Sequence, residues 1–138
     1  MSERKELDPC NQLDAEVVVS LLMASPVQQI WQILMSTAGA EIVLGPGAQF
    51  GEKGRSWASD NGRTGVIRTL HPWEVVRFTW RENEQSSASM VRIDLIPQED
   101  QTKVVLSHSN LPDEVSQAEI KGHWQQVLDN LASADLDN

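Results

Sequence analysis

The side chains of this 138-residue chain that titrate near neutral pH are three histidines, His71, His108 and His123. His108 has the most informative setting, because it follows Leu106 on one face of a predicted strand. If that face is turned toward the interior, His108 can orient or protonate a polar group of a ligand. The alternative is a core histidine that hydrogen-bonds the backbone or a loop near Asn110.

The other two histidines have less informative settings. His123 lies about 100° around a predicted helix from Trp124, which places it at an edge or in solvent. His71 precedes Pro72 and is expected to support a turn. No His-x-x-x-His or Glu-x-x-His spacing occurs, and the one cysteine, Cys10, precedes the first apolar segment. We therefore predict no metal site, no cofactor and no intrachain disulfide.

Sequence motifs for catalysis are absent. The chain has no tyrosine, no Gly-x-Ser-x-Gly turn and no phosphate-binding glycine loop. No pair of carboxylates falls on inward-facing positions of the predicted strands. The sequence therefore predicts no catalytic residue.

The charge balance narrows the choice of partners. Lysine and arginine number 11 against 20 aspartate and glutamate, for a formal net charge of -9. This excess of negative charge disfavours a nucleic-acid backbone and an anionic membrane surface as partners. The N-terminal stretch is polar, and no apolar run approaches the roughly 20 residues that span a bilayer. We expect a cytoplasmic protein.

The spacing of apolar residues predicts an α+β domain. A β-branched run begins it, helical periodicity follows, and alternation with a period of two then predicts antiparallel strands. The predicted elements are a strand at 15–24, helices at 25–36 and 37–45, strands at 50–59, 62–71, 74–81, 88–97 and 102–109, and a helix of about 18 residues from about 116.

Two of the predicted helices begin with a capping pattern. Ser25 is expected to cap the first helix, with Pro26 at its first position and Gln28 completing a Ser-x-x-Gln capping box. Ser116 and Glu119 form the same pattern before the last helix.

The last helix carries one apolar stripe, at Ile120, Trp124, Val127, Leu128 and Leu131. A helix of about 18 residues extends about 27 Å, long enough to lie along the whole face of a curved sheet. We expect Trp124 at its centre to point at the concave face. Gly122 is expected to allow a close approach or to leave space.

The five tryptophans divide by position. Trp31 is expected in the core between the first helix and the sheet, while Trp80 and Trp124 either line a cavity or simply pack. Trp57 and Trp73 are expected near turns or at the mouth of the cavity.

Charged residues alternate with apolar ones along the predicted strands. Arg77, Arg92 and Asp94 fall on the positions expected to face solvent. Arg63 and Arg68 flank a glycine-containing strand and could approach the mouth of a cavity.

Four local patterns occur in a fixed order along residues 15 to about 133: Ser25-Pro26-Val27 with Ile30-Trp31; Gly65-x-Ile67 leading to His71-Pro72 and Phe78-Thr79-Trp80; Thr102-Lys103-Val104-Val105-Leu106-Ser107-His108; and Trp124 with Leu128 and Leu131. Together they resemble the START-like, or SRPBCC, superfamily, in the branch of homologues of the activator of the heat shock protein 90 ATPase. One departure is His123, where many members have glycine directly before the helix tryptophan.

The resemblance implies a helix-grip fold, in which a curved antiparallel sheet wraps around a long C-terminal helix and two short helices follow the first strand. It implies one domain at 14–135 after a flexible leader at 1–13. It also implies a cavity between the sheet and the last helix.

The resemblance leaves three roles open. The first is a non-enzymatic binding protein for a hydrophobic or lipid-like small molecule, whose site residues are Trp80, Ile93, Leu106, His108, Ile120 and Trp124, with His108 orienting a polar group. The second is a cyclase or hydrolase that uses His108 as acid or base. The third is an interaction protein like the chaperone activators, less favoured because the chain lacks their extra N-terminal domain. A second copy of the chain or a chaperone would be its macromolecular partner.

Overall fold

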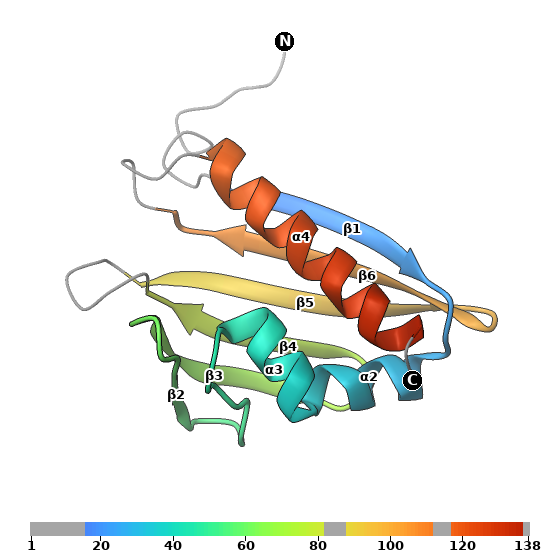
Figure 1. The fold of residues 1–138 in the computed structure, drawn as a ribbon, viewed down its shortest axis with the longest axis horizontal. Helices are drawn as coiled ribbons and strands as arrows, with labels where there is room; N and C mark the ends of the chain where they lie inside the picture. Colours follow the sequence, from blue (N-terminus) through green and yellow to red (C-terminus); the bar gives the residue numbers. More distant parts are fainter. Residues whose placement is uncertain (1–15, 82–87, 112–116, 137–138) are drawn as a thin grey trace, which may run out of the picture.

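One curved antiparallel sheet of six strands has three helices against one face (Figure 1). The computed structural model describes residues 16–81, 88–111 and 117–136; the predictions for the leader at 1–13, Cys10 and Ser116 lie outside them. The elements are β1 (Val17–Met23), α2 (Val27–Met35), α3 (Thr37–Leu44), β2 (Ser56–Ala58), β3 (Thr64–His71), β4 (Val75–Trp80), β5 (Ser89–Gln98), β6 (Gln101–Ser109) and α4 (Gln117–Leu136). The predicted α+β helix-grip fold is confirmed.

The strand order is β1-β6-β5-β4-β3-β2, and every neighbouring pair is antiparallel. One predicted strand is much shorter than expected, because residues 50–59 form a strand only at Ser56–Ala58. Gly51 and Gly54 have positive φ angles of 66° and 87°, and Arg55 donates a backbone hydrogen bond back to Glu52. This turn ends the extended conformation before β2 begins.

Alternation along the strands separates a covered face from an open one. In β5 the residues Val91, Ile93 and Leu95 are buried, while Arg92 between them is exposed. Phe78 in β4 is buried and Arg77 beside it is only half-buried. The predicted inward and outward positions are confirmed, and the helices cover only the inward side (Figure 1).

Helix α4 has 20 residues, so it extends about 30 Å across the covered face. It packs against β1, α2 and α3. All five members of the predicted stripe, from Ile120 to Leu131, are buried. Gly122 is exposed, and a Cβ atom there would meet nothing within 4 Å among the described residues. A close approach is therefore not the reason for this glycine.

The predicted cap of the first helix is wrong. Pro26 occupies the N-cap of α2 without a side-chain cap, and the Ser25 hydroxyl instead donates to Oδ1 of Asp135, 2.6 Å away near the end of α4. Gln29 donates to the same oxygen at 3.0 Å, and Thr102 donates to the Ser25 carbonyl at 2.9 Å. Asp135 is only 5% exposed, so burying its carboxylate without hydrogen-bond donors would cost more free energy than leaving the first turn of α2 without a side-chain cap.

We predict that the polar cluster around Asp135 contributes to the stability of the fold. Replacing Asp135 by alanine removes the acceptor for Ser25 and Gln29, and we expect a loss of about 2 kcal/mol in the free energy of unfolding. Urea titration followed by circular dichroism measures the loss. Asp129→Ala, on the exposed side of the same helix, is the control and should change stability by less than about 0.5 kcal/mol. Equal effects of the two substitutions would contradict a specific role for the cluster.

The tryptophans fall partly where expected. Trp31 is buried, as predicted, and Trp73 is exposed in the turn between β3 and β4, as predicted. Trp57 lies in β2 next to the β2–β3 turn, as predicted, but it is buried there: the side chain is 3% exposed and its Nε1 donates to the carbonyl oxygen of Thr79 at 3.2 Å. The space comes from Gly65, which pairs with Trp57 across the strands: a Cβ atom there would lie 2.5 Å from the indole nitrogen.

Candidate functional site

The six predicted site residues all face the space between the sheet and α4. Each is buried, with exposed fractions from 0% to 8%. Ile93 and Leu106 are directly paired on neighbouring strands, and Ile120 lies one turn before Trp124 on α4. Their side chains fill this space. The polar members lie together at the end of the space nearer the start of α4.

His108 forms a hydrogen-bonded network with two other side chains. The Trp124 indole Nε1 donates to His108 Nδ1 at 2.9 Å, and Ser89 Oγ lies 2.6 Å from His108 Nε2. Because an indole N–H can only donate, Nδ1 must be the acceptor and Nε2 carries the proton. Nε2 then donates to Ser89, whose hydroxyl donates to the Trp80 carbonyl oxygen at 3.0 Å. The partners are these side chains, rather than the backbone or the loop near Asn110.

The surroundings of His108 keep its ring neutral. Burial, with a smaller contribution from the positive charge that His123 can carry, lowers the pKa of His108 to about 4. The imidazole is therefore uncharged at neutral pH. Since both ring nitrogens are already hydrogen-bonded inside the protein, an acid or base role for His108 would require one of these bonds to break.

Trp80 is the centre of an aromatic and cationic cluster. Its ring has His108 edge-on, with centroids 4.9 Å apart, and Trp124 tilted at 6.0 Å. The Arg63 guanidinium lies 5.1 Å from the ring centroid, and His123 lies 6.4 Å away. Arg63 was predicted to approach the mouth of a cavity, and it makes a cation–π contact with Trp80.

The indole N–H of Trp80 has no hydrogen-bond partner among the described residues, although the side chain is only 4% exposed. A buried donor left without an acceptor costs about 1–3 kcal/mol. Native proteins rarely leave one without a reason, such as a bound molecule.

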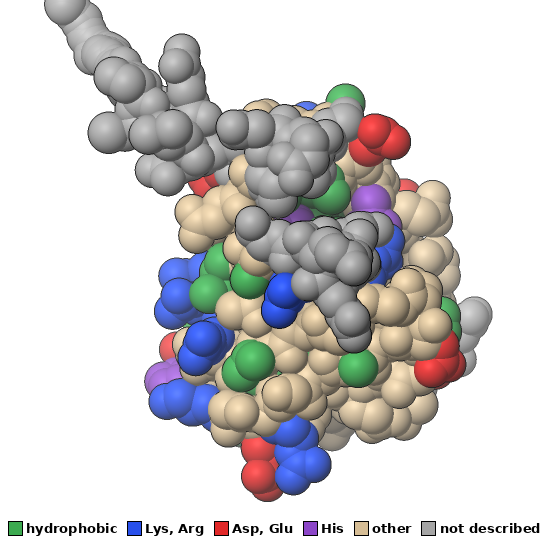
Figure 2. Space-filling view, turned by 90° about the vertical axis from the view of Figure 1, so that its left-hand side faces the viewer, with side chains coloured by type: hydrophobic (Ala, Val, Ile, Leu, Met, Phe, Trp, Pro, Cys, Tyr) green, Lys and Arg blue, Asp and Glu red, His purple; other side chains and the backbone are tan. Residues whose placement is uncertain are grey.

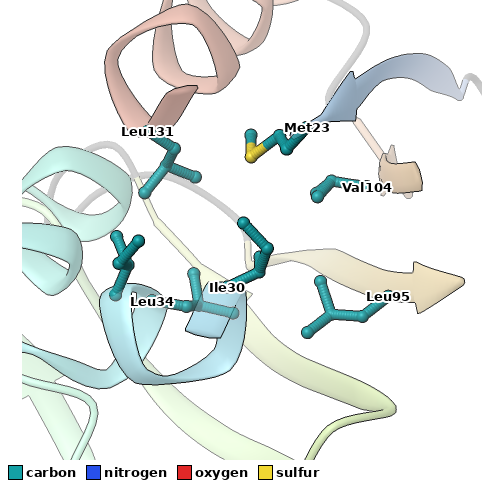
Figure 3. Close-up of a pocket in the computed structure, with 7 residues that line it drawn as sticks. Met23, Ile30, Leu34, Leu95, Val104 and Leu131 are labelled. Atoms are coloured by element: carbon teal, nitrogen blue, oxygen red, sulfur yellow. The ribbon is translucent and has the colours of Figure 1, made fainter. Parts of the chain in front are cut away.

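A small apolar cavity lies at the opposite end of the sheet–helix space. It measures about 10 Å³ and is lined by Met23, Ile30, Ile33, Leu34, Leu95, Val104 and Leu131 (Figure 3). That volume matches about one water molecule, and the walls are apolar. None of the six predicted site residues lines it. This cavity is too small for a hydrophobic ligand.

Comparison with known families decides the classification. Residues 19–134 match the family described as activator of Hsp90 ATPase homolog 1-like protein. The chain belongs to this family.

Solved structures share the fold of this activator-family domain. They include MLL2253 from Mesorhizobium loti, with 20% identity, TM-score 0.76 and coverage of 88% of this chain and 96% of that one. The Aha1 dimer from Colwellia psychrerythraea has 20% identity, TM-score 0.73 and coverage of 87% and 95%. DynU16 from the dynemicin biosynthetic locus has 18% identity and TM-score 0.74; the match covers 86% of this chain but only 46% of DynU16. No curated protein matches the sequence.

The described residues of this activator-family domain offer neither a metal site nor a membrane-spanning helix. No group of three His, Cys, Asp or Glu residues in the described ranges could hold a metal ion. Within the same ranges, none of the helices has the length and apolar character to cross a membrane.

Sequence reasoning missed one member of the network in this activator-family domain. Ser89 lies two residues before Val91, so strand alternation already places it on the inward face. The signal was therefore present, but serine on a predicted strand end carries no indication of its partner. His123 lies at the edge of the cluster, which is one of the two positions expected for it. Its ring centroid is 4.7 Å from that of Trp124.

Proposed function

We propose that this domain binds a small molecule with an apolar body and a hydrogen-bond acceptor at the Trp80 end of the sheet–helix space. The observation that carries the proposal is the buried Trp80 indole N–H, which has no acceptor among the described residues. A ligand oxygen about 2.9 Å from Nε1 would supply the missing bond. Because these side chains fill the space between the sheet and α4, binding requires them to move apart; Trp80, Trp124 and His108 would then form the near wall, and Ile93, Leu106 and Ile120 the deeper one.

The Arg63 cation beside Trp80 favours an acidic acceptor. The Arg63 guanidinium lies over the indole ring, and His123 lies on the same side of α4 as the cluster. A carboxylate that accepts from the indole would lie near the Arg63 guanidinium, and hydrogen bonds that involve a charge are roughly twice as strong as neutral ones. A carboxylic acid with an apolar body therefore suits the site better than a plain hydrocarbon.

The hydrogen-bond network favours binding over turnover. Ser89 is the hydroxyl nearest His108, but it donates to a backbone carbonyl and accepts from a neutral imidazole. Such a pair lacks the free base that activates a nucleophile. A cyclase or hydrolase role, a chaperone partner and self-association remain predictions. Self-association has support from the Colwellia psychrerythraea relative, whose solution structure is a dimer.

Native mass spectrometry of the purified protein, followed by denaturation, is the first test and identifies any small molecule that copurifies. A direct titration then uses naphthalene carboxylate as an acidic aromatic probe and methylnaphthalene as its counterpart without an acceptor. We expect the Trp80 indole resonance to shift with the carboxylate. Trp80→Phe, which keeps the ring but removes the donor, should weaken carboxylate binding about tenfold.

Trp31→Phe provides the matched control, since Trp31 is buried elsewhere in the core. It should leave the affinity for naphthalene carboxylate unchanged. If both tryptophan variants lose the same affinity, or if methylnaphthalene responds to Trp80→Phe as strongly as the carboxylate does, the indole N–H is not the recognition group.

A further inference from the structure

The outer face of the sheet, opposite the helices, is unusually basic for this protein. It carries Arg68 from β3, Arg77 from β4, Arg92 from β5 and Lys103 from β6. The whole chain has a net charge of -9, yet Asp94 is the one acidic residue among the described strand positions of this face. In the end-on view of Figure 2, Lys and Arg side chains gather on the side away from the helices. We call these four residues with Asp94 the outer basic face.

Two of its arginines are placed against each other. Arg77 pairs directly with Arg92 across β4 and β5, and like charges in that position destabilise a sheet. Asp94 accepts hydrogen bonds from Arg92 Nε at 2.9 and 3.1 Å, which neutralises only one of the pair. Among the described residues, no ion pair involves Arg77 or Arg68. Folding alone does not explain this arrangement.

The position of Arg68 also indicates a functional role for the outer basic face. The pairing of β3 with β4 shifts register between Ile67 and Thr69, so Arg68 lies at a β-bulge. Bulges redirect a side chain and are common beside functional sites. Arg68 is exposed at this bulge, on the strand next to Arg77.

Apolar surface lies beside the arginines. Trp73 is 52% exposed in the β3–β4 turn and has a φ of 70°, a conformation that bulky residues rarely adopt. A hollow of about 320 Å³ begins at Glu74, the next residue in the chain, and is lined by Glu74, Val75, Arg92, Asp94, Leu95, Ile96 and Val105. Tryptophan and arginine are the residues most often found at the energetic centre of protein interfaces. Strained, exposed residues of this kind cluster at functional positions.

We propose that the outer basic face docks an acidic segment of a partner protein. Carboxylates of the segment lie against Arg77 and Arg92, and an apolar side chain enters the hollow beside Trp73. Charge complementarity selects the acidic partner. A short protein segment fits better than a nucleic acid or an anionic membrane, because it can place a few carboxylates on the arginines and one apolar side chain in the hollow, whereas an extended polyanion would also meet the acidic remainder of a chain whose net charge is -9.

The binding test uses a short synthetic peptide in which Glu and Leu alternate, and a counterpart with Lys in place of Glu. We expect the Glu peptide to shift the amide resonances of β4 and β5 and the indole resonance of Trp73, more strongly at low than at physiological ionic strength. The double variant Arg77→Ser with Arg92→Ser should bind the Glu peptide at least about tenfold more weakly. Lys121→Ser, an exposed cation on α4, is the control and should bind normally.

A stability measurement separates recognition from structure. Arg77→Thr alone should raise the Tm by about 1–2 °C, because it relieves the repulsion from Arg92 and places a β-branched residue in the strand. A lower Tm would show that Arg77 supports the fold and would overturn the inference. So would absence of Glu-peptide binding at low salt, unchanged binding by the double variant, or tighter binding of an oligonucleotide or an anionic lipid vesicle at the same face.

Discussion

Trp124→Ala is expected to lower the free energy of unfolding by about 3–5 kcal/mol. The side chain is 0% exposed and heads the largest fully buried side chains of the described core. Its removal leaves a large void between α4 and the sheet, and it also leaves His108 Nδ1 without a donor. Because a domain of this size has a total stability of about 5–15 kcal/mol, the variant should be close to unfolding. Urea titration followed by circular dichroism measures the difference.

Trp73→Ala is the control for this prediction, since Trp73 is exposed and a change there should stay within about 0.5 kcal/mol. A double-mutant cycle then separates packing from hydrogen bonding. Trp124→Phe keeps most of the volume but loses the donor, and His108→Leu loses the acceptor. If the indole–imidazole bond is as strong as its geometry indicates, the two substitutions should couple by about 1 kcal/mol or more. Strict additivity would mean that Trp124 acts through packing alone.

Acidification is expected to destabilise the fold through His108. The folded-state pKa of this histidine is about 4, against an ordinary value of 6.5, so the unfolded chain binds the proton first as the pH falls. Stability from the neutral ring is complete above about pH 6.5 and is lost progressively as the pH drops to about 4. One pKa unit corresponds to about 1.4 kcal/mol, so the loss over this window is about 3 kcal/mol.

His108→Gln isolates this contribution, because a glutamine amide can accept from Trp124 and donate to Ser89 without titrating. The acidic residues titrate equally in both proteins, and the difference in unfolding free energy between wild type and variant should therefore shrink by about 3 kcal/mol from pH 7 to pH 4. A difference that stays constant over this range would show that His108 does not gain a proton on unfolding.

These two predictions concern the same cluster that the ligand proposal uses, but they test different properties. His108, hydrogen-bonded at both ring nitrogens, lies against Trp80 in the wall of the proposed site. The stability experiments measure that wall without any ligand. The Trp80→Phe titration measures recognition, since it removes a donor that the fold itself leaves without an acceptor among the described residues.

The local periodicity of the sequence was sufficient to predict the face that several side chains take. Period-two alternation placed Trp80 and His108 inward and Arg77 outward, and the helical stripe placed Trp124 against the sheet. These predictions succeeded because the direction of a side chain depends on the geometry of its own strand or helix. The order of the motifs also indicated the family, which the match over residues 19–134 confirmed.

Only the tertiary structure decided which partner each polar or aromatic group has. The local sequence around Ser25 favours a cap on α2, yet the Ser25 hydroxyl donates to Asp135, 110 residues away. A buried carboxylate without a donor would cost more free energy than an uncapped helix end. Trp57 is buried because Gly65 on the neighbouring strand leaves room for its ring. The sequence pattern predicts which face of a strand or helix a side chain takes. Hydrogen bonds and packing depend instead on the distances between elements, and those distances are set only when the sheet and α4 pack together.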